Sequence, residues 1–290
     1  MKVGLMLPQA PEDGAGRTWT EISDMARRAE DGGADSVWVA DHFLYRPGDG
    51  SEVGYHEAWS LVAALAATTS RLEVGTLVTA TSFRTPGMLA KIAATTNDVA
   101  GGRLVLGLGC GWHEPEYRAF GYPFDHRVGR FEESLAVLVP LLRGERVTFD
   151  GRWTRAEDAV LLPHVEAPPR ILIAATRERM LRLTARYADQ WQTAWFGLPD
   201  DRWRERHAAF VAACAAEGRD PAGVETTVGV DVGTAPGDGS PRSLPLDPSA
   251  IADGLAAWAA EGVGHIQLGL PESTPATYDV CLEAMGRFRG

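Results

Sequence analysis

Short apolar runs alternate with amphipathic stretches along the chain. The first run is Val3–Leu7, and residues 18–31 after it carry apolar side chains at the three- to four-residue spacing of a helix. Thr18 and Glu21 have the spacing of a capping box at the start of that stretch. Ser36–Ala40 is short and mostly apolar, as in a strand buried on both faces. The pattern therefore predicts a strand, a helix and a second strand.

The same alternation continues to the end of the sequence. The further predicted strands are Leu72–Val78, Arg103–Leu108, Ile171–Ala174, Gln190–Thr193, Thr226–Val232 and His265–Leu270. Helical stretches are predicted near 56–69, 85–99 and 201–216, around the apolar residues of 131–142 and 180–187, and after Asp247-Pro248 and Thr274-Pro275. Parallel strands with crossover helices form an open sheet or a closed barrel, and eight successive units favour an α/β fold of the (β/α)8 TIM-barrel type. We expect residues 1–290 to form one domain.

Two long connections interrupt this alternation. Residues 109–126 follow the fourth predicted strand, and residues 233–247, rich in Gly, Pro and Ser, follow the seventh. We expect both to be insertion loops. A polar segment around Asp150-Gly151 predicts a hairpin.

Charge and cysteine content narrow the function classes. A formal net charge of −11 argues against nucleic acid, which needs clustered Lys and Arg. The cysteines, Cys110, Cys214 and Cys281, are odd in number and lack metal-site spacing, which favours a reducing compartment and no metal site. No run approaches the about 18 apolar residues of a membrane span, and the run before Pro8 is too short for a signal peptide. We therefore expect a cytoplasmic protein with no membrane contact.

Reactive groups in such barrels collect at the carboxyl ends of the strands. Asp41-His42 follows the second strand. A histidine there can carry a proton near neutral pH, and an adjacent carboxylate can orient it. Gly109-Cys110-Gly111 follows the fourth strand, where missing side chains let backbone approach a flat ring. Ala175-Thr176-Arg177 and Thr193 follow the fifth and sixth strands.

Four segments carry a resemblance to a known family. They are GADSVWVADHF (33–43), EVGTLVTATSFRTPGMLAK (73–91), GGRLVLGLGCGW (101–112) and ARYADQW (185–191). In this order the chain resembles the luciferase-like superfamily, particularly its branch that uses the deazaflavin coenzyme F420, from residue 3 to about 195. The resemblance implies an oxidoreductase that transfers hydride between F420 and a small organic substrate, and a homodimer.

The resemblance also implies roles for individual residues. His42, helped by Asp41, would act as proton donor or acceptor beside the reactive carbon of the cofactor. A non-prolyl cis peptide at Leu77–Val78 would back the cofactor ring, with Thr79 next to it. The other residues that we expect to bind the cofactor are Gly109, Cys110, Gly111, Ala175, Thr176, Arg177 and Thr193.

One departure from the family leaves alternatives open. Many relatives hold the cofactor phosphate on a glycine pair at the start of the fifth helix, where this chain has Ala174–Glu178. Thr176 and Arg177 would either replace those glycines or fill the pocket. A monooxygenase using reduced FMN is the second hypothesis, and a non-catalytic flavin-binding barrel the third. The Asp41-His42-Phe43 triplet favours the deazaflavin.

Several neighbouring residues have an ordinary structural explanation. His113, Glu114 and Glu116 lack metal-binding spacing and predict a solvated loop. Arg84 is either an anion contact or a solvated loop residue. Trp112 is either a lid or a packing residue, and it stands where relatives that oxidise sugar phosphates carry Glu. We therefore do not expect a sugar phosphate as substrate.

Overall fold

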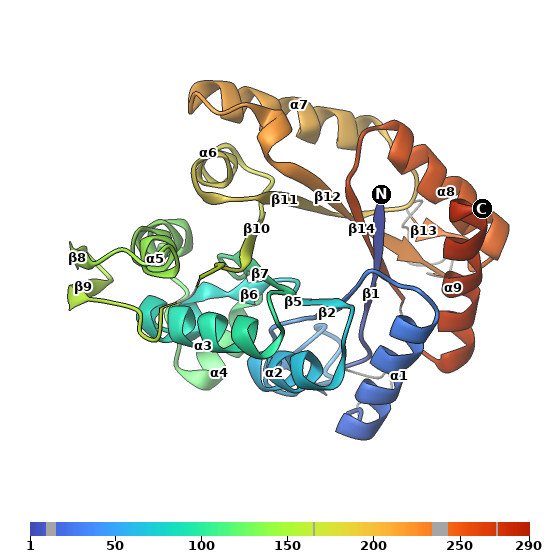
Figure 1. Ribbon diagram of the computed structural model, residues 1–290, viewed down its shortest axis with the longest axis horizontal. Coiled ribbons are helices and arrows are strands. Elements are labelled where there is room, and N and C mark those ends of the chain that lie inside the picture. Colours follow the sequence, from blue (N-terminus) through green and yellow to red (C-terminus); the bar gives the residue numbers. More distant parts are fainter. Residues whose placement is uncertain (10–15, 165, 234–242, 271) are drawn as a thin grey trace.

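The computed structural model describes residues 1–9, 16–164, 166–233, 243–270 and 272–290. Within these residues, eight parallel strands form a closed barrel with helices outside the ring (Figure 1). Each strand pairs with the next along the chain, and the last pairs with the first, so the predicted barrel is confirmed. In order they are β1 (Lys2–Met6), β2 (Ser36–Val39), β5 (Glu73–Thr76), β7 (Leu104–Gly109), β10 (Arg170–Ala174), β11 (Gln190–Phe196), β12 (Glu225–Val232) and β14 (His265–Gly269).

The helices begin where the sequence places capping residues. Thr18 and Glu21 form the predicted capping box, and the Asp247 side chain accepts hydrogen bonds from Ser249 N–H and Ala250 N–H. The helices are α1 (Trp19–Asp31), α2 (Ala58–Thr68), α3 (Pro86–Val99), α4 (Glu114–Phe120), α5 (Arg127–Leu142), α6 (Glu178–Tyr187), α7 (Asp201–Ala216), α8 (Pro248–Ala260) and α9 (Pro275–Arg289).

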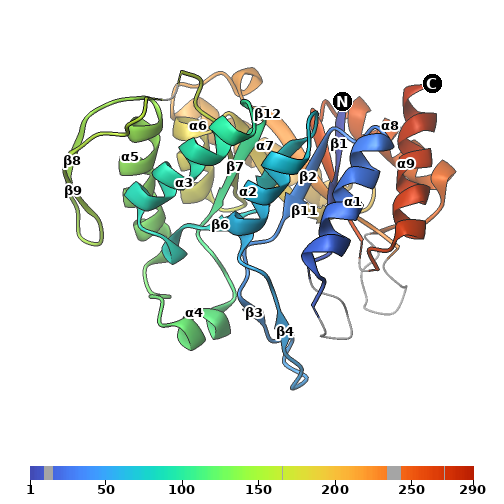
Figure 2. The same cartoon turned by 60° about the horizontal axis from the view of Figure 1, so that its bottom comes forward.

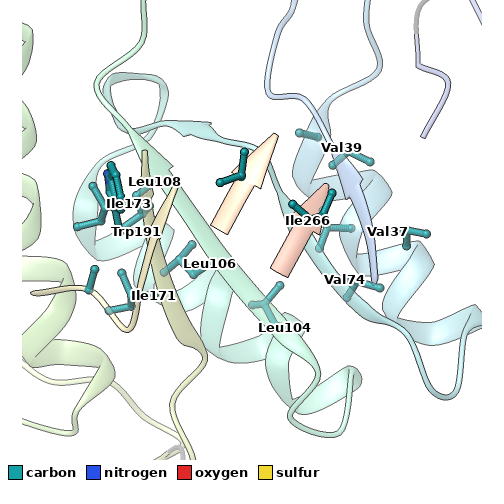
Figure 3. Packing of buried hydrophobic residues seen from close by; sticks show 14 of the residues in the cluster. Val37, Val39, Val74, Leu104, Leu106, Leu108, Ile171, Ile173, Trp191 and Ile266 are labelled. Carbon is teal, nitrogen blue, oxygen red and sulfur yellow. The ribbon is translucent and has the colours of Figure 1, made fainter. Parts of the chain in front are cut away.

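The hydrophobic core lies between the strands and the surrounding helices. Alternate side chains of each strand point outward into it, for example Val37 and Val39 of β2 and Leu104, Leu106 and Leu108 of β7 (Figure 3). These side chains are buried, and so are the helix residues packed on them. Burial on the helix side explains why the strands have a high apolar content.

The barrel interior is more polar than the sequence pattern suggests. Thr227 of β12 and His265 of β14 lie side by side in register, and Gln267 is two residues further along β14. All three are fully buried, and Nε2 of His265 lies 2.8 Å from the hydroxyl of Ser36. Nδ1 of His265, the Thr227 hydroxyl and the Gln267 amide have no partner among the residues described. Burial, together with the charges of Lys2 and Arg170, lowers the pKa of His265 to about 3, so its imidazole is neutral at pH 7.

The connections at the carboxyl ends of the strands carry extra structure. A hairpin of β3 (Leu44–Tyr45) and β4 (Val53–Gly54) follows β2, and α4 lies in the predicted insertion after β7. Figure 2 shows this hairpin and α4 at the end of the barrel away from the two chain termini. Most of the predicted insertion after β12 lies outside the described residues, and Ser243–Leu244 forms the short strand β13 on β12. The predicted hairpin around Asp150-Gly151 is confirmed, with strands β8 (Val147–Asp150) and β9 (Arg155–Ala159).

The third predicted strand is interrupted. The predicted strand Leu72–Val78 ends as β5 at Thr76, and a short strand β6 (Thr79–Ala80) follows it. The bond between Leu77 and Val78 is the cis peptide that the resemblance implies. A second non-prolyl cis bond joins Ala194 to Trp195 in β11, which the sequence analysis does not foresee. No helix among the described residues has the length and apolar character to cross a membrane.

Candidate active site

A cavity of about 490 Å³ opens at the carboxyl ends of the strands. Its volume lies within the ~300–1,000 Å³ typical of small-molecule and cofactor sites. It is lined by residues from the connection after β2, the β5–β6 segment, β7 and the connection after it, α4, the end of β10 and β11, so segments distant in sequence converge on it. The lining includes most of the expected site residues: Asp41, His42, Leu77, Val78, Gly109, Cys110, Gly111, Ala175, Thr176 and Thr193. Thr79 and Arg177 are not among the described lining residues.

His42 is held by a carboxylate that the sequence analysis did not select. Its Nδ1 lies 2.8 Å from Oε1 of Glu116, which reaches it from α4. The other carboxylate oxygen of Glu116 accepts a hydrogen bond from Phe43 N–H at 3.0 Å. Both residues line the cavity. Since an ionised carboxylate only accepts, Nδ1 is the protonated ring nitrogen in this pair, and Nε2 is left for proton exchange.

The predicted solvated loop is wrong for two of its three residues. His113 and Glu116 are buried, whereas the Glu114 carboxylate is partly exposed and pairs with Arg118 one turn later. Nε2 of His113 accepts a hydrogen bond from Arg46 N–H at 3.0 Å, and burial lowers the pKa of this imidazole. The sequence feature that could have indicated this burial is helical spacing, because Glu116 lies three residues after His113 and next to the buried Tyr117.

Asp41 does not orient His42, so that expected pairing is wrong. Its carboxylate binds both terminal nitrogens of Arg84, at 2.7 and 3.0 Å, and accepts a hydrogen bond from Ala80 N–H at 3.0 Å. Arg84 also pairs with Glu57, the residue that caps α2. Arg84 is therefore a buried bridge between two carboxylates, neither solvated nor a free anion contact. Burial raises the pKa of Asp41, and Arg84 opposes that rise.

The Asp41–Arg84 pair fixes one wall of the cavity. Through Ala80 it ties the end of β2 to the segment after the Leu77–Val78 bulge. Thr79 is buried in that segment, and its hydroxyl lies 2.7 Å from the hydroxyl of Thr76. Thr79 therefore stabilises the wall without being one of the described residues that line the cavity.

Glycines of β7 allow the bulge to pack closely. A Cβ at Gly107 would lie 1.9 Å from the Thr76 carbonyl oxygen, and one at Gly109 would lie 2.6 Å from a methyl of Val78. Gly111 has a φ of +74°, and a Cβ there would overlap the Tyr117 hydroxyl. These positions therefore require glycine for close contact within the wall itself. Beside them, burial raises the pKa of the Cys110 thiol, so it stays protonated at neutral pH.

The start of α6 forms another edge of the site. Ala175 is buried, whereas Thr176 and Arg177 are exposed. Arg177 is the N-cap residue, and its side chain makes no capping hydrogen bond. Because neither side chain fills the cavity, the alternative in which they block the pocket does not hold. Free N–H groups and a guanidinium at a helix start suit an anion.

Aromatic rings surround His42. Its ring centroid lies 5.4 Å from that of Tyr55 and 5.6 Å from that of Trp112, which meets it edge-on at 85°. The ring centroid of Tyr45 lies 5.9 Å from that of Trp112. Trp112 is 62% exposed and lines the cavity, so it stands at the mouth without closing it.

Trp195 of β11 lines the cavity and is not among the predicted site residues. Gly229 of β12 and Gly269 of β14 make room for its indole, because a Cβ at these positions would lie 2.6 and 3.1 Å from the ring. The sequence feature that accompanies this indole is a glycine in each of two neighbouring strands. Its connection with Trp195 can be recognised only when the strand register is known.

Comparisons with known proteins agree with this architecture. The chain is 32% identical over 85% of its length to a phthiodiolone/phenolphthiodiolone dimycocerosates ketoreductase of Mycobacterium bovis (strain BCG / Pasteur 1173P2), of which it covers 72%. It is 33% identical over 58% of its length to an F420-dependent glucose-6-phosphate dehydrogenase of Amycolatopsis mediterranei (strain U-32), of which it covers 51%.

A solved structure shares the fold. An F420-dependent secondary alcohol dehydrogenase in complex with an F420-acetone adduct superposes with a TM-score of 0.82 at 18% identity, covering 100% of this chain and 99% of that one. The sequence model of the family described as luciferase-like monooxygenase matches residues 1–240. The chain belongs to the luciferase-like monooxygenase family.

Proposed function

We propose that this protein is an F420-dependent oxidoreductase that interconverts a carbinol and a carbonyl on a small organic substrate. The observation that carries the proposal is His42, held in the cavity wall by Glu116 at 2.8 Å. The names of the relatives support the reaction type, since they include a ketoreductase and an F420-dependent dehydrogenase.

The residues present fit a flat tricyclic cofactor. Leu77 and Val78 supply an apolar wall, and Gly109 and Ala174 keep the ends of β7 and β10 small. At the rim, Thr176, Arg177 and the start of α6 would hold a cofactor phosphate.

When bound, the deazaflavin supplies a ring carbon that accepts or gives hydride. The protein handles the proton. Nε2 of His42 takes the hydroxyl proton as a carbinol is oxidised, and returns it to the carbonyl oxygen in the reverse direction. Glu116 keeps Nδ1 protonated and stabilises the imidazolium that forms when Nε2 gains a proton. The aromatic rings around His42 reduce water access to the reacting atoms.

Equilibrium titration with F420 and with FMN, side by side, tests the proposal. We expect micromolar binding of F420, and Arg177→Ala should weaken it by ~10-fold, as expected for a lost charge-assisted contact to phosphate. His42→Ala should keep F420 affinity and lose turnover with a panel of secondary alcohols. Tight binding of FMN alone would favour the monooxygenase. Binding of F420 without turnover that depends on His42 would favour a non-catalytic barrel, and binding of neither cofactor would refute the proposal.

Two further expectations accompany this function. A homodimer and a cytoplasmic location stay predictions. The molecular mass in solution, measured by analytical ultracentrifugation, tests the first.

A further inference from the structure

We propose that the substrate is uncharged and carries an apolar, ring-sized body that lies against Trp112 and Trp195. This inference rests on the proposed function and names the substrate class of the same site.

The described part of the cavity lining offers an anionic substrate no Lys or Arg side chain. Its two carboxylates are engaged, Asp41 with Arg84 and Glu116 with His42. A phosphate or carboxylate entering here would lose water without gaining a charged partner, which is costly.

Two guanidinium groups near the wall donate hydrogen bonds to residues of the wall itself. Arg127 donates to the Gly111 carbonyl at 2.6 Å and lies 4.2 Å from the Phe124 ring centroid. Arg206 donates to the Thr193 hydroxyl and to the Ala194 carbonyl, each at 2.8 Å. These contacts direct positive charge into the wall.

Two indoles provide the aromatic part of the apolar surface of the cavity. Trp112 stands at the mouth beside His42, and Trp195 lies on β11 against Gly229 and Gly269. Both line the cavity. Glycine on two neighbouring strands keeps space for the Trp195 ring, which makes this indole a built part of the wall. Aromatic walls favour flat or aliphatic bodies and give neutral ligands their affinity.

Two ketones that share the acetylphenyl body and differ by one carboxylate test the charge rule. We would titrate acetophenone and 4-acetylbenzoate by calorimetry into protein loaded with oxidised F420, a state that has no hydride to give. Acetophenone should bind saturably, and 4-acetylbenzoate at least ~10-fold more weakly, because its carboxylate is desolvated without a partner. Equal or tighter binding of the anion, or binding of neither ketone, would overturn the inference.

Variants of Trp112 separate this role from a structural one. Trp112→Ala should weaken the binding of acetophenone by ~10-fold, as truncation of a well-placed aromatic side chain does. Trp112→Arg should raise the affinity for 4-acetylbenzoate and lower that for acetophenone, which a purely structural role would not produce. Trp19→Ala, on the surface of α1 outside the cavity, is the matched control and should change neither. Unchanged affinities in both Trp112 variants would count against the proposal.

Failure of the proposed function is distinguishable from failure of this inference. If F420 does not bind, the function proposed above falls, and the same two ketones titrated into the protein alone still test the charge rule. If F420 binds and the anionic ketone binds best, only the substrate class is wrong.

Discussion

Glu116 and His42 are 74 positions apart in the sequence, and their side chains meet at 2.8 Å inside the cavity. The pair joins α4 to the end of β2. We expect Glu116→Gln to lower kcat for a secondary alcohol by ~10-fold or more, because the charge that stabilises the imidazolium is lost. Steady-state kinetics, with F420 affinity measured separately, check this.

Glu114→Gln is the matched control for that variant, since Glu114 lies on the same helix and pairs with the exposed Arg118. A Glu116→Gln protein that turns over at the wild-type rate, or one that loses only F420 affinity, would remove Glu116 from the proton chemistry.

The buried Arg84 should be important for stability. Arg84→Met leaves the buried Asp41 carboxylate and the partly exposed Glu57 carboxylate without their shared cation, and removing the partner of a buried charge such as Asp41 costs about 3–5 kcal/mol. Chemical denaturation should show the loss. Arg146→Met removes a more exposed pair with Asp158 and should cost only about 0–1 kcal/mol. Similar losses in the two variants would mean that the bridge contributes no more than a surface ion pair.

Gly107 should not accept a side chain. In Gly107→Ala the new methyl would lie 1.9 Å from the Thr76 carbonyl oxygen, so β5 and β7 must separate next to the cofactor wall. Overpacking of this kind costs about 1–3 kcal/mol, and we expect weaker F420 binding as well. Thermal unfolding and cofactor titration measure the two effects.

Gly87→Ala provides the comparison, because a Cβ at this position of α3 meets nothing within 4 Å. Alanine in a helix should raise stability by up to about 1 kcal/mol. If both alanine variants behave alike, the close approach at Gly107 has no energetic consequence.

His265 should make stability depend on pH. Its pKa is about 3 in the folded protein and about 6.5 when unfolded, so between these values the unfolded state binds more protons. Stability contributed by the neutral imidazole is therefore present above pH 6.5 and is lost as pH falls, by up to about 1.4 kcal/mol per pH unit. Thermal midpoints between pH 7 and 5 should fall more for the wild type than for His265→Gln. Parallel curves for the two proteins would show that this imidazole titrates normally.

Local signals in the sequence predicted most of the barrel. Thr18, Asp247 and Thr274 each cap a helix where the residue pattern placed one, because capping depends on residues a few positions apart. The cis bond at Leu77–Val78 came from family resemblance, since a run of ordinary strand residues carries no sign of it.

The contacts within the site depended on long-range geometry. Asp41 and His42 are neighbours in sequence, yet their partners are Arg84 and Glu116, which the barrel brings in from other connections. Adjacent residues at a strand end point in different directions, so sequence proximity gave the wrong pair. Trp195 was not selected as a site residue for the same reason, because the space for its indole is provided by glycines on two other strands.

The position of Glu116 on α4 affects how this enzyme can diversify. The connection after β7 provides both Trp112 at the cavity mouth and the carboxylate that holds His42. Under the function proposed above, exchanging this connection with that of a relative would alter substrate choice and proton transfer in one event. A transplanted loop would give a working catalyst only if it brings its own acidic residue to the same place, which restricts the repertoire of loops that evolution or an engineer can combine with this barrel.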